Sequence, residues 1–187
     1  MLQLKNIHHS WTLFLDRDGV INHEKDGSYI FNWEEFCFYN NVKKALQILN
    51  NHFDTIVMVT NQRGIGKKLM TEDDLNNIHQ NMLEEIKLEG GRIDKIYYCS
   101  DLENSSPNRK PNYGMALQAK NDFPLIDFSK SIMVGNKLSD MQFGRNAGMY
   151  TIFVATTHPE TPYPHELIDI RFDDLLSFAN AVENNTQ

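Results

Sequence analysis

An apolar run that ends in two closely spaced acids narrows the possible folds of this sequence. Residues 13–15 are apolar, and Asp16, Asp18 and Gly19 come after them. If the run is a buried strand, residues two apart project to the same side, so the two carboxylates leave the strand end together. Such a pair repels itself and favours a bound cation. Taken alone, the pattern is more typical of a solvated turn, so its meaning depends on the rest of the chain.

Two other apolar runs also end in small polar residues. The run at 55–59 is followed by Thr-Asn-Gln at 60–62, and the run at 131–134 by Gly-Asn-Lys-Leu-Ser-Asp at 135–140. Hydroxyls, amides and free backbone N–H groups at strand ends suit phosphate oxygens. Each segment alone could be an ordinary strand-to-loop turn. Polar residues at the end of every one of these runs favour one shared site at the carboxyl edge of a sheet.

A pair of cations stands between these segments. Arg109 and Lys110 precede Pro111, just before a helix that we expect from about residue 112. Lysine supplies a point charge for a phosphoryl group, and arginine can hold an oxyanion through two hydrogen bonds. A solvated basic helix start would look the same by itself. Together with the acids and the polar strand ends, the pair indicates recognition of a phosphoryl group.

Strands and helices are expected to alternate along the chain. Apolar, β-branched runs predict strands at 12–16, 55–60, 95–100, 131–135 and 150–155. Apolar residues at helical spacing predict helices at 41–51, 71–90, 112–121, 138–147 and 173–183. This alternation predicts an α/β fold, a three-layer, doubly wound, Rossmann-like parallel sheet. We expect a single domain over 1–187, with an aromatic-rich flap at about 19–40 and a frayed tail at about 183–187.

Composition narrows the class of partner. The chain has 187 residues, and 18 Lys and Arg against 25 Asp and Glu give a net charge of −7, which argues against general binding to nucleic acid or to an anionic membrane. We see no signal-peptide core and no stretch long enough to span a bilayer. Two cysteines, Cys37 and Cys99, allow one disulfide at most. The expectation is a cytoplasmic protein, with a monomer as the default state.

In this order, the motifs resemble those of the haloacid dehalogenase (HAD) superfamily of phosphatases. Within it, the chain is similar to the branch of histidinol-phosphate phosphatases and D-glycero-D-manno-heptose 1,7-bisphosphate phosphatases. The segments that point to this branch are Asp-Arg-Asp-Gly-Val-Ile-Asn at 16–22, Thr-Asn-Gln-Arg-Gly-Ile-Gly at 60–66 and Lys-Leu-Ser-Asp-Met at 137–141. The resemblance covers about residues 13–155 and implies a HAD-like fold with a short flap after the first strand and no large cap domain.

The resemblance also implies roles for the residues at the strand ends. Asp16 would be the nucleophile that becomes an aspartyl phosphate, and Asp18 the general acid and base. Thr60 and Asn61 would hold phosphoryl oxygens, while Lys110 would neutralise the transferring group. The implied cofactor is Mg²⁺. Its expected ligands are the Asp16 carboxylate, the Asp18 backbone carbonyl and Asn136, with Asp140 as a further ligand or a supporting partner.

The same resemblance implies contacts to the remainder of a small phosphorylated metabolite. The residues expected to make them are Gln62, Arg63, Arg109 and Lys137 on the sheet side, and Asp26, Gly27, Ser28 and Tyr29 in the flap. Of the histidines, His158 and His165 lie in a proline-rich segment, and we expect them at the surface.

Two positions depart from the pattern of this branch. Its members usually carry a zinc-binding loop with three cysteines and a histidine, but residues 99–108 here hold one cysteine and no histidine, so we expect no structural zinc. Asn136 stands where an aspartate metal ligand is usual. Three hypotheses follow: a Mg²⁺-dependent phosphatase of a sugar bisphosphate such as the heptose compound, a histidinol-phosphate phosphatase, or a phosphate-binding pseudoenzyme weakened by Asn136.

Overall fold

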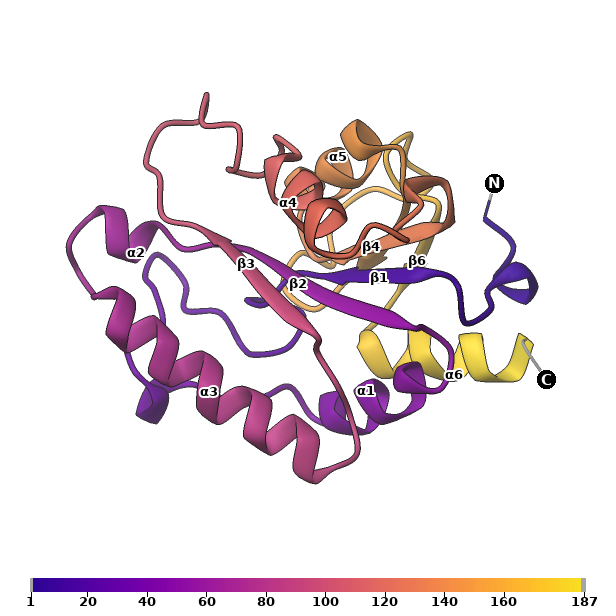
Figure 1. Ribbon diagram of the computed structural model, residues 1–187, viewed down its shortest axis with the longest axis horizontal. Helices are drawn as coiled ribbons and strands as arrows, with labels where there is room; N and C mark the ends of the chain where they lie inside the picture. Colours follow the sequence, from indigo (N-terminus) through magenta and orange to yellow (C-terminus); the bar gives the residue numbers. More distant parts are fainter. Residues whose placement is uncertain (1, 186–187) are drawn as a thin grey trace.

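A single six-stranded parallel sheet forms the centre of the protein (Figure 1). The computed structural model describes residues 2–185. The strands lie in the order β3-β2-β1-β4-β5-β6. Their bounds are β1 Thr12–Leu15, β2 Thr55–Asn61, β3 Lys95–Cys99, β4 Ser131–Gly135, β5 Tyr150–Val154 and β6 Ile170–Phe172. Successive strands are added in one direction from β1 to β3 and in the opposite direction from β4 to β6, so the strand order reverses between β1 and β4. In doubly wound folds ligands bind outside the carboxyl ends of the strands at such a point.

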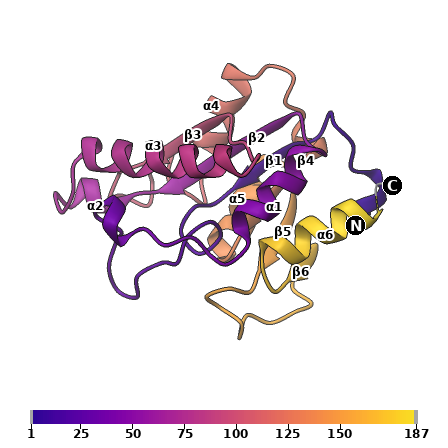
Figure 2. The same cartoon turned by 90° about the horizontal axis from the view of Figure 1, so that it is seen from below.

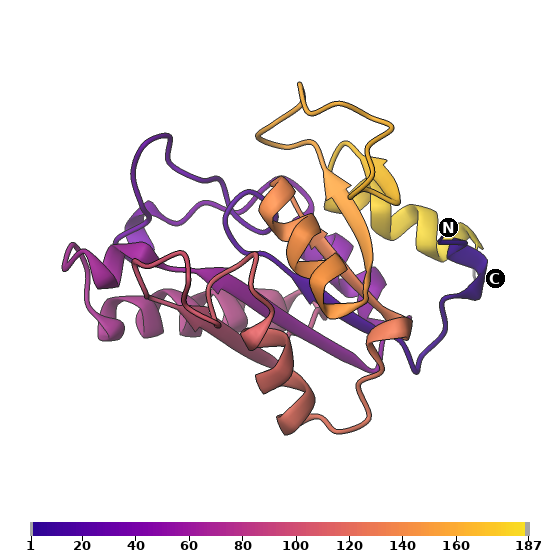
Figure 3. The same cartoon turned by 90° about the horizontal axis from the view of Figure 1, so that it is seen from above.

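Helices cover both faces of the sheet. One face carries α1 (Val42–Asn50), α3 (Glu72–Leu88) and α6 (Leu175–Asn185), which lie towards the viewer in Figure 2. The other carries α4 (Gly114–Asp122) and α5 (Leu138–Ala147), in front in Figure 3. The remaining helical segments are short: α2 (Arg63–Gly66) and three 3₁₀ turns at Leu4–Asn6, Trp33–Glu35 and Phe128–Lys130. The predicted three-layer, doubly wound α/β fold is therefore confirmed.

Alternation along β1 builds the two cores. Leu13 and Leu15 pack in the cluster beneath α1, α3 and α6, whereas Phe14 between them belongs to the cluster beneath α4 and α5. All three side chains are fully buried. A strand covered on both faces has no polar side, which explains why its sequence is a continuous apolar run. The first charged residue, Asp16, therefore appears only where the strand leaves the sheet.

The flap (residues 19–40) is a single excursion and not a cap domain. Its rings of Trp33, Phe36 and Phe38 contact one another, with centroids of Trp33 and Phe36 5.0 Å apart. They pack against the core on the α3 side of the sheet. The aromatic residues thus hold the flap to the domain.

No helix among the described residues combines the length and apolar character needed to cross a membrane.

Three elements differ from the predicted pattern. Strand β6 was not expected, because its three residues are all only partly buried and carry no long apolar run. The four residues of α2 include two glycines, which favour a loop over a helix. Helix α4 begins at Gly114, two residues later than expected, since the Asn112 side chain bonds to backbone carbonyls of the preceding loop. At the tail, α6 extends to Asn185, and residues 186–187 lie outside the described range.

An arginine is the largest fully buried side chain in the described part of the chain. Arg17 follows Asp16 and donates through Nε and Nη2 to the carboxylate of Asp18, at 3.2 and 2.8 Å. Its Nη1 lies 3.3 Å from Nε2 of His79, on the buried face of α3. A guanidinium can only donate, so His79 accepts through an unprotonated Nε2. Burial and the Arg17 charge lower the pKa of His79 to about 3.

The lowered pKa of His79 predicts a pH-dependent stability. Between pH 6.5 and 3 the unfolded chain binds a proton at this histidine and the folded chain does not, so stability falls as the pH falls through this range. The expected loss from pH 7 to pH 5 is about 2 kcal/mol. In His79→Gln, which keeps an acceptor for Arg17 but does not titrate, urea unfolding at both pH values should show a loss smaller by that amount. His8→Gln, at an exposed position, should retain the wild-type loss; equal losses in all three proteins would contradict the assignment.

Candidate active site

A cavity of about 540 Å³ opens at the carboxyl edge of the sheet. Every residue predicted to be catalytic or to contact substrate lines it. Of the predicted metal ligands, Asp16, Asp18 and Asp140 line it as well. Asn136 does not, because it lies completely buried behind the wall. The structure thus brings together predicted residues that are up to 124 positions apart in sequence, from Asp16 to Asp140.

Lys110 joins two of the predicted carboxylates. Its Nζ lies 2.9 Å from Oδ1 of Asp16 and 2.7 Å from Oδ1 of Asp140. The lysine is 4% exposed, and both acids are buried as well. Burial opposes the charge of the ammonium group, but the two carboxylates together raise the pKa of Lys110. The lysine therefore stays charged, and a phosphoryl group reaching Asp16 would meet a fixed cation.

Asp16 carries an unusually high pKa. Burial and the nearby Asp140 carboxylate raise it to about 7, although Lys110 acts to lower it. The backbone N–H of Arg17 donates to Asp16 Oδ1 over 2.7 Å, which fixes the orientation of the carboxylate. A nucleophilic carboxylate must be ionised, so a further cation beside Asp16 would favour its reactive form.

Both polar atoms of the Asn61 side chain are hydrogen-bonded to the backbone of Lys110. Its Nδ2 donates to the backbone carbonyl of Lys110, and its Oδ1 accepts from the Lys110 N–H, both over 3.1 Å. The end of β2 is thereby tied to the loop that carries the lysine. This differs from the predicted use of the Asn61 amide on phosphoryl oxygens. The neighbouring Thr60 hydroxyl accepts from Gln62 Nε2 over 2.8 Å and still has its own proton to donate.

Asp18 is held by three donors. Besides Arg17, Asn22 Nδ2 donates to Oδ1 over 2.9 Å and Gln62 Nε2 to Oδ2 over 3.0 Å. Burial acts to raise the pKa of Asp18, but these contacts outweigh it and lower the pKa. Gln62, predicted to contact substrate, thus lines the cavity and also positions the second acid.

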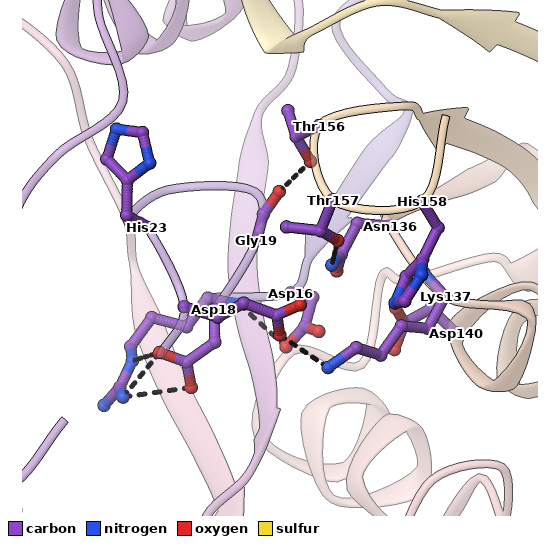
Figure 4. Close-up of polar contacts among 12 residues, drawn as sticks. Asp16, Asp18, Gly19, His23, Asn136, Lys137, Asp140, Thr156, Thr157 and His158 are labelled. Carbon is purple, nitrogen blue, oxygen red and sulfur yellow. Dashed lines mark hydrogen bonds and ion pairs between the residues drawn. The ribbon is translucent and has the colours of Figure 1, made fainter. Parts of the chain in front are cut away.

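Asn136 presents an unpaired oxygen beneath Gly19. Its Nδ2 donates to Thr157 Oγ1 over 2.6 Å, while its Oδ1 is buried with no hydrogen-bond partner. A Cβ at position 19 would lie 2.0 Å from Nδ2, and φ there is +88°, so only glycine fits. The Thr156 hydroxyl donates to the Gly19 carbonyl (Figure 4). An orphaned buried acceptor usually signals a missing partner such as an ion.

The oxygen atoms around Asp16 and Asn136 fit Mg²⁺. This ion takes one or two carboxylates, other oxygens and several waters in place of a cage of side chains. Asp16 supplies a carboxylate and Asn136 an amide oxygen without a partner. Residues 2–185 contain no group of three His, Cys, Asp or Glu side chains placed to hold a metal.

The start of α5 positions Asp140 and Lys137. Asp140 Oδ2 accepts from the backbone N–H of Lys137 over 3.0 Å. Gly135 makes room for this turn, because a Cβ there would lie 2.2 Å from the Asp140 Cβ. The Lys137 ammonium pairs with Glu24 of the flap over 2.6 Å. Burial opposes the Lys137 charge, but Glu24 raises the pKa of this lysine.

Two arginines, Arg63 and Arg109, line another part of the cavity wall. Their hydrogen bonds within the protein go only to neutral acceptors. Arg63 Nη2 donates to the Leu102 carbonyl and to Asn104 Oδ1, over 2.8 and 2.7 Å. Arg109 reaches the same Oδ1 and the Asp101 carbonyl, each over 3.4 Å. Neither arginine forms a salt bridge within residues 2–185, and Arg63 Nε is buried without a partner. Burial and the nearby Arg63 charge lower the pKa of Arg109. Such a pair is suited to an anion.

The loop after β3 is held by polar side chains. The Cys99 thiol lies 3.6 Å from Asp101 Oδ2 and 3.9 Å from Ser106 Oγ, and Ser106 donates to the same Asp101 oxygen. Burial raises the pKa of Cys99, so it stays a thiol. Asn112 Nδ2 donates to the carbonyls of Asn104 and Ser106. The lack of a structural zinc stays a prediction.

Several functional positions were missing from the sequence-based set. Glu24, Lys25, Ile30, Ser139 and His158 also line the cavity. His158 is partly exposed, as expected, and it also lines the cavity, because the β5–β6 loop returns over the site. A sequence signal for Arg17 and Asn22 existed, since both lie in the Asp-Arg-Asp-Gly-Val-Ile-Asn motif. His79 and Thr157 had none, because their roles depend on packing between distant segments.

Sequence comparison places the chain among phosphatases. Residues 12–172 match the family described as polynucleotide kinase 3 phosphatase. A protein of Mycobacterium tuberculosis named D-glycero-alpha-D-manno-heptose-1,7-bisphosphate 7-phosphatase is 34% identical over 93% of this chain and 92% of its own length. A protein of the same name from Campylobacter jejuni is 39% identical over 76% of this chain and 80% of its length.

Comparison with solved structures also finds phosphatases. The D,D-heptose 1,7-bisphosphate phosphatase of B. bronchiseptica, complexed with magnesium and phosphate, has a TM-score of 0.84 and 26% identity, covering 93% of this chain and 98% of its own. The enzyme of the same name from Burkholderia thailandensis has a TM-score of 0.67 and 27% identity, covering 91% and 97%. With its site geometry, fold and sequence in agreement, the chain belongs to the polynucleotide kinase 3 phosphatase family of the HAD superfamily and is a phosphatase.

Proposed function

We propose that this phosphatase removes one phosphate from a sugar bisphosphate, with D-glycero-D-manno-heptose 1,7-bisphosphate as the favoured substrate. The observation that carries this proposal is the pair of arginines, Arg63 and Arg109, which lines the Asp16 cavity without a carboxylate partner. One phosphate would react at Asp16, and the arginines would hold the second. The names of the relatives support the same substrate.

The chemistry would begin at Asp16. Its carboxylate attacks phosphorus in line, forming an aspartyl phosphate as the bond from phosphorus to the sugar oxygen breaks. Asp18 is ionised in the unliganded protein, because its pKa is lowered. To act as the general acid it would take up a proton from the monoanionic form of the bound phosphate and give it to the leaving alcohol, and it would then take one from the water that hydrolyses the intermediate. Lys110 and the Thr60 hydroxyl would stabilise the charge on the transferring group. Asn61 contributes indirectly by fixing the backbone of Lys110.

Magnesium is the proposed cofactor. Asp16, the backbone carbonyl of Asp18 and Asn136 would hold it, with Asp140 next to them and already bound by Lys110 and the Lys137 N–H. When bound, the ion would offset the repulsion between a carboxylate nucleophile and a phosphate dianion. The raised pKa of Asp16 supports a need for this extra positive charge.

A phosphate-release panel tests the substrate. Purified protein with Mg²⁺ should hydrolyse heptose 1,7-bisphosphate with a higher kcat/KM than histidinol phosphate or a 3′-phosphorylated oligonucleotide. In the double variant Arg63→Gln/Arg109→Gln, the ratio of kcat/KM for the heptose compound to kcat/KM for the other substrates should fall about tenfold or more, because the charged hydrogen bonds to the second phosphate are lost. A wild-type preference for histidinol phosphate or for the oligonucleotide would overturn the proposed substrate.

Removal of the nucleophile tests the mechanism. Asp16→Asn keeps a side chain that can accept from the Arg17 N–H but cannot form the aspartyl phosphate. We expect kcat to fall at least about a thousandfold, with a melting temperature close to that of the wild type. Asp173→Asn, an exposed acid-to-amide change, is the matched control and should keep full activity. Near-native turnover by folded Asp16→Asn would refute the assignment.

Asn136 should raise the Mg²⁺ concentration that the enzyme needs for half-maximal activity. An amide oxygen lacks the full negative charge of a carboxylate, so Asn136→Asp should lower the half-saturating Mg²⁺ concentration by roughly tenfold with little change in kcat. The Thr157 hydroxyl could donate to the new carboxylate in place of accepting. If the wild type and Asn136→Asp show the same Mg²⁺ dependence, Asn136 is not a ligand and Asp140 takes this role. If only Asn136→Asp hydrolyses phosphate esters at saturating Mg²⁺, the pseudoenzyme hypothesis is favoured.

A further inference from the structure

His158 stands at the start of the loop that returns over the cavity from β5 to β6. It lines the same cavity as Asp16, Lys137 and Asp140. In Figure 4 its ring lies on the side of Lys137 and Asp140, whereas the His23 ring lies on the far side of the site. His23 instead contacts the ring of Tyr39, with centroids 3.9 Å apart. Of these two histidines, His158 is the one available to a substrate.

The backbone on both sides of His158 is fixed. Before it, Thr156 donates to the Gly19 carbonyl and Thr157 accepts from Asn136. After it, the guanidinium of Arg171 in β6 donates to the carbonyls of Pro159 and Thr161. A side chain between two anchored segments loses little further freedom on binding a ligand, which favours a recognition role.

The orientation of the imidazole is also set. His158 Nδ1 lies 3.2 Å from a carboxylate oxygen of Glu160, which can only accept, so Nδ1 carries the proton of this hydrogen bond. In the neutral ring Nε2 is then an acceptor. No hydrogen bond to His158 Nε2 is found among residues 2–185.

The charges around His158 indicate which kind of substrate group would bind to Nε2. Glu160 lies against the His158 ring, and Glu24 neutralises Lys137 nearby. This part of the wall is therefore less attractive to an anion than the part that carries Arg63 and Arg109, which have no carboxylate partner. A neutral donor such as a hydroxyl fits an imidazole acceptor held beside a carboxylate.

We infer that His158 determines specificity by accepting a hydrogen bond from a hydroxyl of the substrate, beyond the reacting phosphate. This inference rests on the proposed function only in the choice of a sugar phosphate as the hydroxyl-bearing ligand. His158 takes no part in the transfer of the phosphoryl group. A hydroxyl-free ester should consequently react at the same rate whether or not the imidazole is present.

The test compares two substrates in four proteins. On heptose 1,7-bisphosphate, His158→Ala should lose about tenfold in kcat/KM, the size expected for one neutral hydrogen bond, mainly through a higher KM. On p-nitrophenyl phosphate, which has no hydroxyl, it should stay within about twofold of the wild type. His158→Gln, whose amide oxygen can accept, should recover part of the loss, and His8→Ala should match the wild type on both substrates.

Two results would overturn the inference. Equal losses on both esters would show a general structural effect, and no loss on either would show that the imidazole makes no substrate contact. If the wild type hydrolyses p-nitrophenyl phosphate but not the heptose compound, the proposed substrate fails. The ratio of rates on glucose 6-phosphate and p-nitrophenyl phosphate, measured in wild type and His158→Ala, then still decides the role of His158.

Discussion

The buried ion cluster of Lys110 with Asp16 and Asp140 is the interaction on which the site depends. Its three members come from the end of β1, the loop before α4 and the first turn of α5. Burying these charges is costly unless they are paired, so loss of Lys110 would leave two buried carboxylates without their shared counter-ion. The arrangement fixes three segments at once, and Asn61 adds the end of β2 through the backbone of Lys110.

The two acids of the motif have opposite environments. Asp16 faces Lys110 and a second carboxylate, and its pKa is raised to about 7. Asp18, two residues later, is surrounded by Arg17, Asn22 and Gln62, and its pKa is lowered. In the unliganded protein this order is the reverse of what the assigned roles need, because a nucleophile must be ionised and a general acid protonated. A cation beside Asp16 would lower the pKa of this carboxyl, while the fully buried Arg17 keeps Asp18 ionised until substrate binds.

Much of this site could be predicted from the ends of apolar runs and from the family motifs, but the part of the wall that carries His158 could not. Asp16, Thr60 and Asp140 follow runs whose burial on both faces makes them visible, and parallel strands bring their ends to one edge. His158 lies on a long loop without periodicity, whose path depends on Thr157 and Arg171. The use of Asn61 on the backbone of Lys110 joins residues 49 apart, a contact that local patterns do not encode.

The reacting centre and the walls of the cavity come from different parts of the fold. Strand ends and helix starts hold the centre, whereas the flap, the loop with Arg109 and the loop with His158 enclose the ligand. These three loops differ in length and composition and are attached at separate edges. A lineage with this architecture could exchange one loop, and with it the preferred metabolite, while the phosphoryl-transfer machinery stayed intact. Substrate range in such enzymes would then diverge by insertion and deletion more readily than by substitution at the strand ends.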